Sequence, residues 1–210
     1  MGFYYDTHPD VKEVMNYSTG KMQANQDNRL VQQYASFNGL NWKKGIDITW
    51  NESGGVECDY VAMRYADVLL MYAEAKIELN QIDATVLNAI NMVRARGFGA
   101  KVTDTNKYPA VTTTDQAELR RTVRLERRVE LAKENLRYMD LIRWKLATKA
   151  LNRKNYGIIY PATPASINNW FWASTPQIDE DGLADFTVME KAEQIAVLSE
   201  RSFPEHQYLW

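Results

Sequence analysis

The clearest pattern of apolar and polar positions lies in the middle of the chain. From 61 to 80 the polar side chains fall on one narrow stripe, and apolar side chains cover most of the remaining helical circumference. This pattern predicts a helix that packs against several neighbours at once. Asp83 can cap a second helix, whose apolar positions recur at helical spacing until Gly97, a typical C-terminal stop. The short connection predicts an antiparallel pair.

A second pair of helices is predicted further along the chain. Thr113 or Asp115 can cap the third helix, which we expect to end near 134–135. The fourth helix is predicted from Arg137 to about Leu151. Its inward face would consist of Met139, Ile142 and Leu146, with Trp144 at the flank. Two helix pairs of about 35 residues each suggest tetratricopeptide-like packing.

The helical pattern is lost on both sides of 61–151. Residues 1–60 are rich in Asn, Gln, Gly and Tyr and are punctuated by turn-forming sequences, which predicts loops with one short strand at 45–50. Residues 152–210 are interrupted by prolines, with a short strand expected at 157–160 and a last helix at 187–201. We therefore predict one mainly α-helical unit with irregular, loop-rich segments on either side, 1–60 and 152–210.

The third helix carries charges that conflict with one another. Arg124 and Arg128, like Glu126 and Glu130, are same-sign pairs four residues apart, which destabilise an isolated helix by about 0.2–0.5 kcal/mol per pair. A solvated helix gains nothing from this arrangement, so we expect the charges to pair with another element. The predicted ion network, which clasps the third helix to the fourth, comprises Glu126, Arg127, Arg128, Glu130, Arg137, Asp140 and Arg143.

Three segments of this region together resemble the C-terminal half of the SusD/RagB family. They are RYADVLLMYAEAK at 64–76, AINMVRARG at 89–97 and ERRVELAKENLRYMDLIRW at 126–144, in the order and spacing of that family. The resemblance implies a non-enzymatic, lipid-anchored nutrient-binding protein on the exterior of a Gram-negative outer membrane. It further implies capture of an oligosaccharide for a TonB-dependent transporter, without a cofactor. Peptide, which part of the family binds, is the alternative ligand.

The resemblance also implies that this chain is a piece of a longer protein. Both ends look like internal sequence, and the lipid anchor is expected to lie outside the chain. The ligand-contacting aromatics of the family lie outside the three matching segments, so the resemblance assigns none of them to a numbered residue.

Composition excludes several classes of function. With 25 Lys and Arg against 27 Asp and Glu, the chain lacks the basic field that a nucleic-acid-binding protein needs. The single cysteine, Cys58, rules out an internal disulfide. His8 and His206 are the only histidines, so neither nucleophilic catalysis nor a His/Cys metal site is supported. The acidic turn at 179–181 lacks the alternating ligands of a calcium loop, and we predict no metal.

Two carboxylates of the third helix are candidates for a catalytic pair. Glu126 and Glu130 lie among arginines, which we expect to lower their pKa values, and this is unsuitable for the general acid of a glycosidase. We therefore predict no catalytic residues. An anion site built from Arg124, Arg127 and Arg128 is an alternative, which the neighbouring acids weaken.

Aromatic residues carry the remaining signal. The chain has six Trp and twelve Tyr. Planar side chains on loops suit the apolar faces of sugar rings, while amides and charges bind the hydroxyl groups. The candidate ligand-binding residues are Asn168, Asn169, Trp170, Trp172, Trp42 and Trp50. Two alternatives remain open: these rings pack in the core, or the protein is a helical scaffold without a small ligand.

Overall fold

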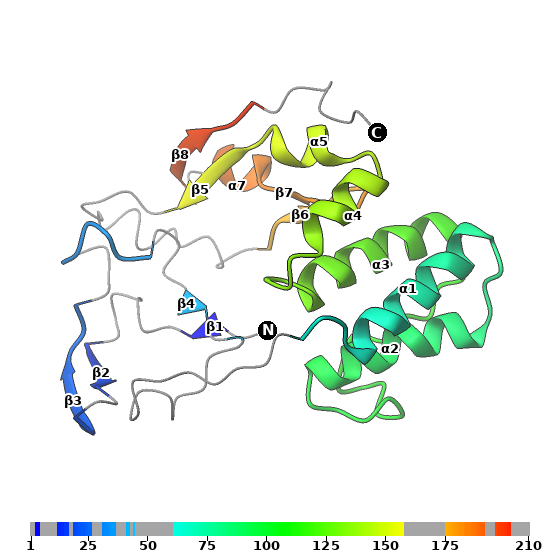
Figure 1. Ribbon diagram of the computed structural model, residues 1–210, viewed down its shortest axis with the longest axis horizontal. Helices are drawn as coiled ribbons and strands as arrows, with labels where there is room; N and C mark the ends of the chain where they lie inside the picture. Colours follow the sequence, from blue (N-terminus) through cyan, green and yellow to red (C-terminus); the bar gives the residue numbers. More distant parts are fainter. Residues whose placement is uncertain are drawn as a thin grey trace.

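The computed structural model describes residues 3–4, 12–16, 19–26, 31–36, 41–42, 44, 61–157, 175–191 and 196–202 (Figure 1). The described helices are α1 (Tyr65–Glu78), α2 (Ala84–Gly97), α3 (Gln116–Glu130), α4 (Arg137–Arg143), α5 (Ala147–Leu151) and α7 (Thr187–Lys191). The described strands form two-stranded antiparallel ladders: β1 (Phe3–Tyr4) with β4 (Asn41–Trp42), β2 (Glu13–Asn16) with β3 (Lys21–Ala24), β5 (Lys154–Gly157) with β8 (Ala196–Glu200), and β6 (Gln177–Ile178) with β7 (Ala184–Asp185).

The predicted mainly helical architecture is confirmed, and its core lies between α1, α2 and α3. Figure 1 shows these three helices side by side, with α4 and α5 beyond α3. The largest fully buried side chains are Leu70 and Ile77 of α1, Val86 and Ile90 of α2, and Leu119 and Val123 of α3. A second cluster, of Leu141, Leu146, Ala147 and Leu183, joins α4 and α5 to the turn before β7. The tetratricopeptide-like repeat remains a prediction.

Local capping signals place the starts of α2 and α3 correctly. The carboxylate of Asp83 accepts hydrogen bonds from the backbone N–H groups of Thr85 (2.9 Å) and Val86 (3.3 Å). Asp115, rather than Thr113, caps α3, because its carboxylate accepts from the N–H group of Glu118 at 2.8 Å. Such caps satisfy amide groups that the first helical turn leaves without partners.

The ends of α3 and α4 differ from the prediction. The third helix ends at Glu130 rather than near 134–135, and Lys133 (φ 65°) and Asn135 (φ 62°) are in the left-handed region. The predicted fourth helix is divided into α4 and α5, with Lys145 at φ 58° between them. Left-handed backbone stops a helix whatever its apolar pattern. Within α4, Met139 of the predicted inward face is 62% exposed, and Leu141 is buried instead.

The flanking segments contain more strand than predicted. Around the turn that ends at Gly20 (φ 66°), β2 and β3 form a hairpin that pairs Asn16 with Lys21. The helix predicted at 187–201 is confirmed at its start, where α7 begins at Thr187, but its extension to 201 is wrong, since β8 follows and pairs with β5. The predicted strand at 157–160 overlaps the structure only at Gly157, the last residue of β5. The strand predicted at 45–50 and Cys58 lie outside the described residues.

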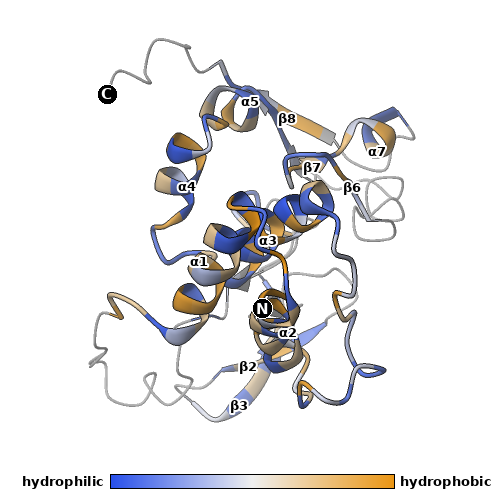
Figure 2. Cartoon of the chain, turned by 90° about the vertical axis from the view of Figure 1, so that its right-hand side faces the viewer, coloured by the Kyte–Doolittle hydropathy of each residue, from blue (hydrophilic) through white to orange (hydrophobic). Residues whose placement is uncertain are grey.

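The polar stripe of α1, not only its apolar surface, faces the interior. Asp67 and Glu74 are buried, whereas Tyr65 is 65% and Val68 42% exposed. Figure 2 shows hydrophilic and hydrophobic segments alternating along α3, the helix against which this stripe packs. The expectation that α1 buries apolar residues nearly all round is therefore wrong, because charged groups of α3 and α4 occupy one of its sides. No helix in the described part of the chain is long and apolar enough to span a membrane.

Candidate functional site

A buried ion cluster joins α1, α3 and α4, and Arg127 of α3 lies at its centre. The Nη1 atom of Arg127 donates to Oδ1 of Asp67 on α1 at 2.8 Å. Its Nε and Nη2 atoms donate to the two carboxylate oxygens of Asp140 on α4, at 2.9 and 3.1 Å. Only 4% of the Arg127 side chain is exposed. A cation this buried requires its carboxylate partners, because it has lost its hydration.

Residues at the end of α4 close the cluster toward solvent. Arg143, with 43% of its side chain exposed, donates to Asp140 at 2.8 Å and to Glu74 at 2.6 Å. The indole N–H of Trp144 also donates to Glu74, at 2.6 Å, and the guanidinium groups of Arg143 and Arg124 lie 4.7 and 5.2 Å from its ring centroid. Every carboxylate of this cluster is bound by an arginine, so the cluster is a clamp between helices rather than acid–base machinery.

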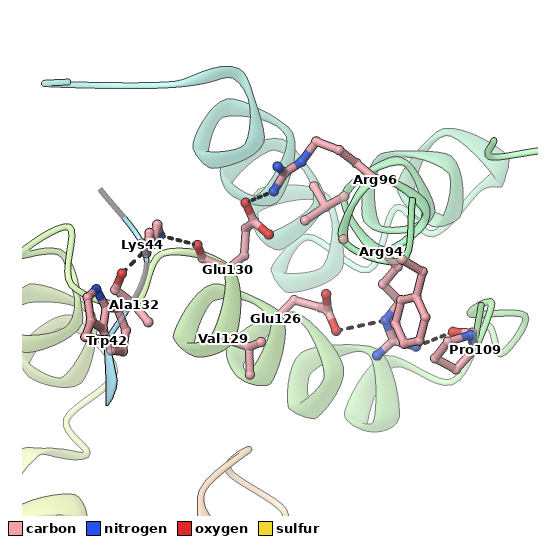
Figure 3. A pocket seen from close by; sticks show the side chains of 12 residues that line it. Trp42, Lys44, Arg94, Arg96, Pro109, Glu126, Val129, Glu130 and Ala132 are labelled. Carbon is pink, nitrogen blue, oxygen red and sulfur yellow. Dashed lines mark hydrogen bonds and ion pairs between the residues drawn. The ribbon is translucent and has the colours of Figure 1, made fainter. Parts of the chain in front are cut away.

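Beside the cluster, a cavity of about 660 Å³ lies where α2 and α3 meet the segment around β4. Figure 3 shows Trp42 and Lys44 toward one end, Arg94 toward the other, and Glu126 and Glu130 of α3 between them. The remaining lining residues are Val93, Arg96, Gly97, Phe98, Pro109, Val129 and Ala132. We call this space the α2–α3 cavity. It combines an indole and a 62% exposed phenyl ring with charged groups of both signs.

The charged groups of the α2–α3 cavity are held in place by short contacts. Arg94 bridges two elements, because its Nε atom is 2.8 Å from Oε1 of Glu126 and its Nη1 atom donates to the carbonyl oxygen of Pro109 at 2.7 Å. The carboxylate of Glu130 pairs with Arg64 and Arg96 (Figure 3 shows the second of these pairs). Rotamers fixed in this way are pre-organised for binding.

Lys44 fixes the segment that carries Trp42 to the end of α3. Its Nζ atom donates to the carbonyl oxygens of Glu130 (2.9 Å) and Ala132 (3.0 Å). These carbonyl groups lie where a helix leaves its acceptors unsatisfied and where a cation is favoured. The Nζ atom of Lys133 lies 5.2 Å from the centroid of the Trp42 ring. The backbone near Trp42 is thus anchored to the end of α3, and Lys133 lies beside the indole ring.

The charge of Glu126 does not follow the sequence-based expectation. Burial raises the pKa of Glu126, and the nearby guanidinium of Arg94 offsets this only in part. The expected lowering of this pKa is therefore wrong, because the loss of hydration outweighs the neighbouring arginines. Arg94 binds the Glu126 carboxylate directly, so Glu126 serves as an ion-pair partner. This arrangement suits hydrogen bonding to a polyhydroxylated ligand, with the indole ring available for an apolar face.

Comparison with known proteins identifies the family of the chain. The family model described as the SusD family matches residues 2–174. The chain belongs to the SusD family. A SusD-like protein P2 of Formosa agariphila is 31% identical over 121 residues, which are 57% of this chain and 22% of that protein. The crystal structure of a SusD-like carbohydrate binding protein from Bacteroides fragilis covers all of this chain with a TM-score of 0.63 at 26% identity.

Both relatives are considerably longer than this SusD-family chain. The chain spans 37% of the Bacteroides fragilis structure and about a fifth of the Formosa agariphila protein. Neither relative is named as an enzyme. The likeness in fold extends over the whole chain, so the helical arrangement described above is that of a SusD-like protein.

The structure places only one of the predicted ligand-binding residues. Trp42 lines the α2–α3 cavity and is half-buried. The other candidates, Asn168, Asn169, Trp170, Trp172 and Trp50, lie outside the described residues. The aromatic and charged lining residues Phe98, Arg94 and Arg96 were not predicted. The sequence AINMVRARGF could have indicated them, because its two arginines fall in the last turn of α2, just before an aromatic residue.

The predicted ion network is divided among separate sites in this SusD-family fold. Arg127, Asp140 and Arg143 meet in the buried cluster, whereas Glu126 and Glu130 pair with arginines of α2. Arg128 and Arg137 form no ion pair with any described residue, and Asp140 acts on Arg137 through its charge alone, so their part in a clasp between α3 and α4 stays a prediction. Sequence reasoning also missed Asp67 and Glu74 of α1, although their separation of seven residues, two helical turns, was a usable signal.

The acidic turn at 179–181 is anchored by basic side chains. Asp181 contacts Arg124 (3.0 Å) and Lys149 (2.5 Å), and Asp179 accepts hydrogen bonds from the backbone N–H groups of Asp181 (3.0 Å) and Leu183 (2.8 Å). Within the described ranges no group of three or more His, Cys, Asp and Glu side chains is arranged to hold a metal ion.

Proposed function

We propose that this chain is part of a non-catalytic, glycan-binding SusD-like protein that captures oligosaccharides at the cell surface. The single observation that carries the proposal is the α2–α3 cavity, in which Trp42 lies among fixed charges within a SusD-family fold. An indole ring binds the C–H face of a sugar, and the charged groups around it bind hydroxyl groups. The carbohydrate-binding description of the Bacteroides fragilis relative supports the same ligand class.

The proposal extends to delivery of the glycan. A SusD-like protein is expected to hold its ligand at the exterior of the outer membrane through a lipid anchor and to pass it to a TonB-dependent transporter. Binding without chemistry suits this role. The α2–α3 cavity contributes ion-paired carboxylates, with no unpaired acid positioned beside a second one.

A glycan array on the full-length protein, followed by calorimetric titration of the glycans that bind, tests the proposal. We expect Trp42→Ala to weaken binding about tenfold, since a lost ring contact is worth about 1–2 kcal/mol, while the melting temperature stays nearly unchanged. Trp172→Ala tests the other predicted ring in the same assay. Tyr34→Ala is the matched control, because Tyr34 is 83% exposed and does not line the cavity.

Two outcomes would contradict the proposal. A protein that binds peptides but no glycan on the arrays would be a peptide-uptake protein. A Trp42→Ala variant that loses several degrees of melting temperature but keeps its glycan affinity would show that the indole is a packing residue, and the α2–α3 cavity would then not be the site.

A further inference from the structure

A second cavity, of about 440 Å³, lies on another face of α3, between that helix, α4, α5 and the strands β5 and β7. We call it the basic pocket. Arg128, Arg137 and Arg153 contribute guanidinium groups to it, and Leu151, Tyr156 and Phe186 contribute apolar surface. None of the ion pairs that fix the α2–α3 cavity reaches this pocket. Its charge therefore has to be explained separately.

Two of the three guanidinium groups form no ion pair within the described chain, although the charges of Asp179 and Asp140 act on Arg128 and Arg137, respectively. Arg128 makes no hydrogen bond or ion pair there, and the Nη1 atom of Arg137 is buried without a hydrogen-bond partner. Arg137 does lie against Trp144, whose ring centroid is 5.7 Å from its guanidinium carbon. Arg153 is the exception, because it pairs with Asp179 at 3.5 Å and donates to the carbonyl oxygen of Ala184.

The carboxylates nearest to these arginines are already bound elsewhere. Asp140 accepts its hydrogen bonds from Arg127 and Arg143 in the buried cluster. Asp179 is shared between Arg153 and Lys149. Glu190, which does not line the pocket, is bound by Lys154 and by the hydroxyl group of Tyr156 at 2.7 Å. The positive charge of Arg128 and Arg137 is therefore left without direct compensation among the described residues.

The environment of these two arginines is unfavourable for cations. Burial, followed by the positive charge of Arg128, lowers the pKa of Arg137 to about 10. Burial and the charge of Arg153 also lower the pKa of Arg128. Both groups remain charged at neutral pH, so each is a partly dehydrated cation beside another. Such a pair is stabilised by an oxyanion that accepts from both guanidinium groups.

The walls of the basic pocket favour an anion that is carried on a sugar ring over a bare ion. The rings of Tyr156 and Phe186 lie 5.3 Å apart and are inclined by 43°, which offers an aromatic surface beside the arginines. Leu141 and Leu151 add aliphatic surface. A small inorganic anion would leave this apolar surface uncovered, whereas the C–H face of a sugar would cover it.

We propose that the basic pocket binds the carboxylate or sulfate group of an acidic sugar, with Arg128 and Arg137 as its ligands. This inference rests on the proposed glycan-binding function and specifies the class of glycan: anionic polysaccharide fragments rather than neutral ones. Bidentate pairing of guanidinium with a planar carboxylate, or with two sulfate oxygens, supplies the selectivity.

Calorimetric titration of the full-length protein tests the inference with three probes: an oligosaccharide that contains glucuronate, a neutral glucose oligosaccharide of equal length, and inorganic sulfate. We expect Arg128→Gln and Arg137→Gln each to weaken the acidic oligosaccharide about tenfold or more and to leave the neutral one unchanged. Arg120→Gln is the matched control, because Arg120 is on the same helix but pairs with Glu78 outside the pocket.

A thermal melt of the same variants separates binding from folding. Removing a half-buried charge that forms no ion pair should leave the melting temperature of the ligand-free protein equal or raise it, so weaker binding would not reflect misfolding. If acidic glycans bind equally well to wild type and to both variants, the inference is overturned while the proposed function stands. Binding of inorganic sulfate without acidic glycan, an adventitious ion only, would also overturn it. If no glycan of either kind binds, the proposed function itself fails.

Discussion

Replacing Asp140 with alanine tests whether the buried ion cluster holds α1, α3 and α4 together. Asp140 is 3% exposed and accepts two hydrogen bonds from Arg127 and two from Arg143, at 2.8 to 3.1 Å. In the variant, Arg127 keeps a hydrogen bond only to Asp67. Removing one partner of a buried pair costs about 3–5 kcal/mol. We expect a loss of about 3 kcal/mol, because Arg143 is partly solvated and retains its contact with Glu74.

Chemical denaturation followed by circular dichroism measures this loss. Glu78→Ala is the matched control, because it removes a two-bond pair with Arg120, also between α1 and α3, at 2.7 and 2.8 Å. The two side chains are 31% and 45% exposed, and the pair should contribute under about 1 kcal/mol. Asp140→Asn keeps the shape and one acceptor, so it should lie between the two. If Asp140→Ala shifts the midpoint no more than Glu78→Ala does, the cluster has no special part in stability.

Two further predictions concern a close contact and the pH dependence of stability. Gly182 has φ 74°, and a Cβ atom there would lie 2.8 Å from a backbone carbonyl oxygen of α3. Gly182→Ala should therefore destabilise the protein by about 1–3 kcal/mol, as measured in a thermal melt. Gly97→Ala is the control, because a Cβ atom at Gly97 would meet nothing within 4 Å. The hydrogen bond from Arg120 lowers the pKa of Glu78. The stabilising contribution of the Glu78 carboxylate is therefore present above its unfolded-state pKa and is lost as pH falls through its folded-state pKa. Burial raises the pKa of Glu126, so the unfavourable contribution of its charged form to stability disappears as pH falls. We measure the free energy of unfolding of wild type and of each variant from about pH 6 down to about pH 3. As pH falls, the stability of wild type relative to Glu78→Gln should decrease, and its stability relative to Glu126→Gln should increase.

Elements with local signals could be predicted from the sequence, and elements that depend on distant partners could not. Asp83 and Asp115 cap their helices through their own side chains, so their positions can be read from neighbouring residues. The break at Lys145 lacks the glycine or asparagine that usually marks left-handed backbone, and the apolar pattern continues through it. The strand β8 exists because β5, about 40 residues earlier, pairs with it, and a sequence window around 196–200 contains no sign of that partner.

In the candidate site, too, local features could be predicted from the sequence, and contacts with distant partners could not. The conflict of like charges on α3 correctly indicated that its arginines need partners on other elements. Which elements supply them depends on packing, and for Arg127 they include Asp67 of α1. The error in the sign of the Glu126 pKa shift has a similar origin. Neighbouring arginines can be counted in the sequence, whereas the depth of burial, which dominates the shift, cannot.

Three consecutive residues of α3 connect the clamp to both cavities. Successive residues of a helix point about 100° apart, so Glu126, Arg127 and Arg128 must face three different directions. Glu126 lines the α2–α3 cavity, Arg127 is locked into the buried cluster, and Arg128 lines the basic pocket. The ion pairs of Arg127 therefore fix the rotation of α3 about its own axis. This rotation in turn sets the directions in which the side chains of Glu126 and Arg128 point. A buried arginine that touches no ligand can in this way determine the geometry of two binding surfaces, which explains why so charged a helix lies at the centre of the fold.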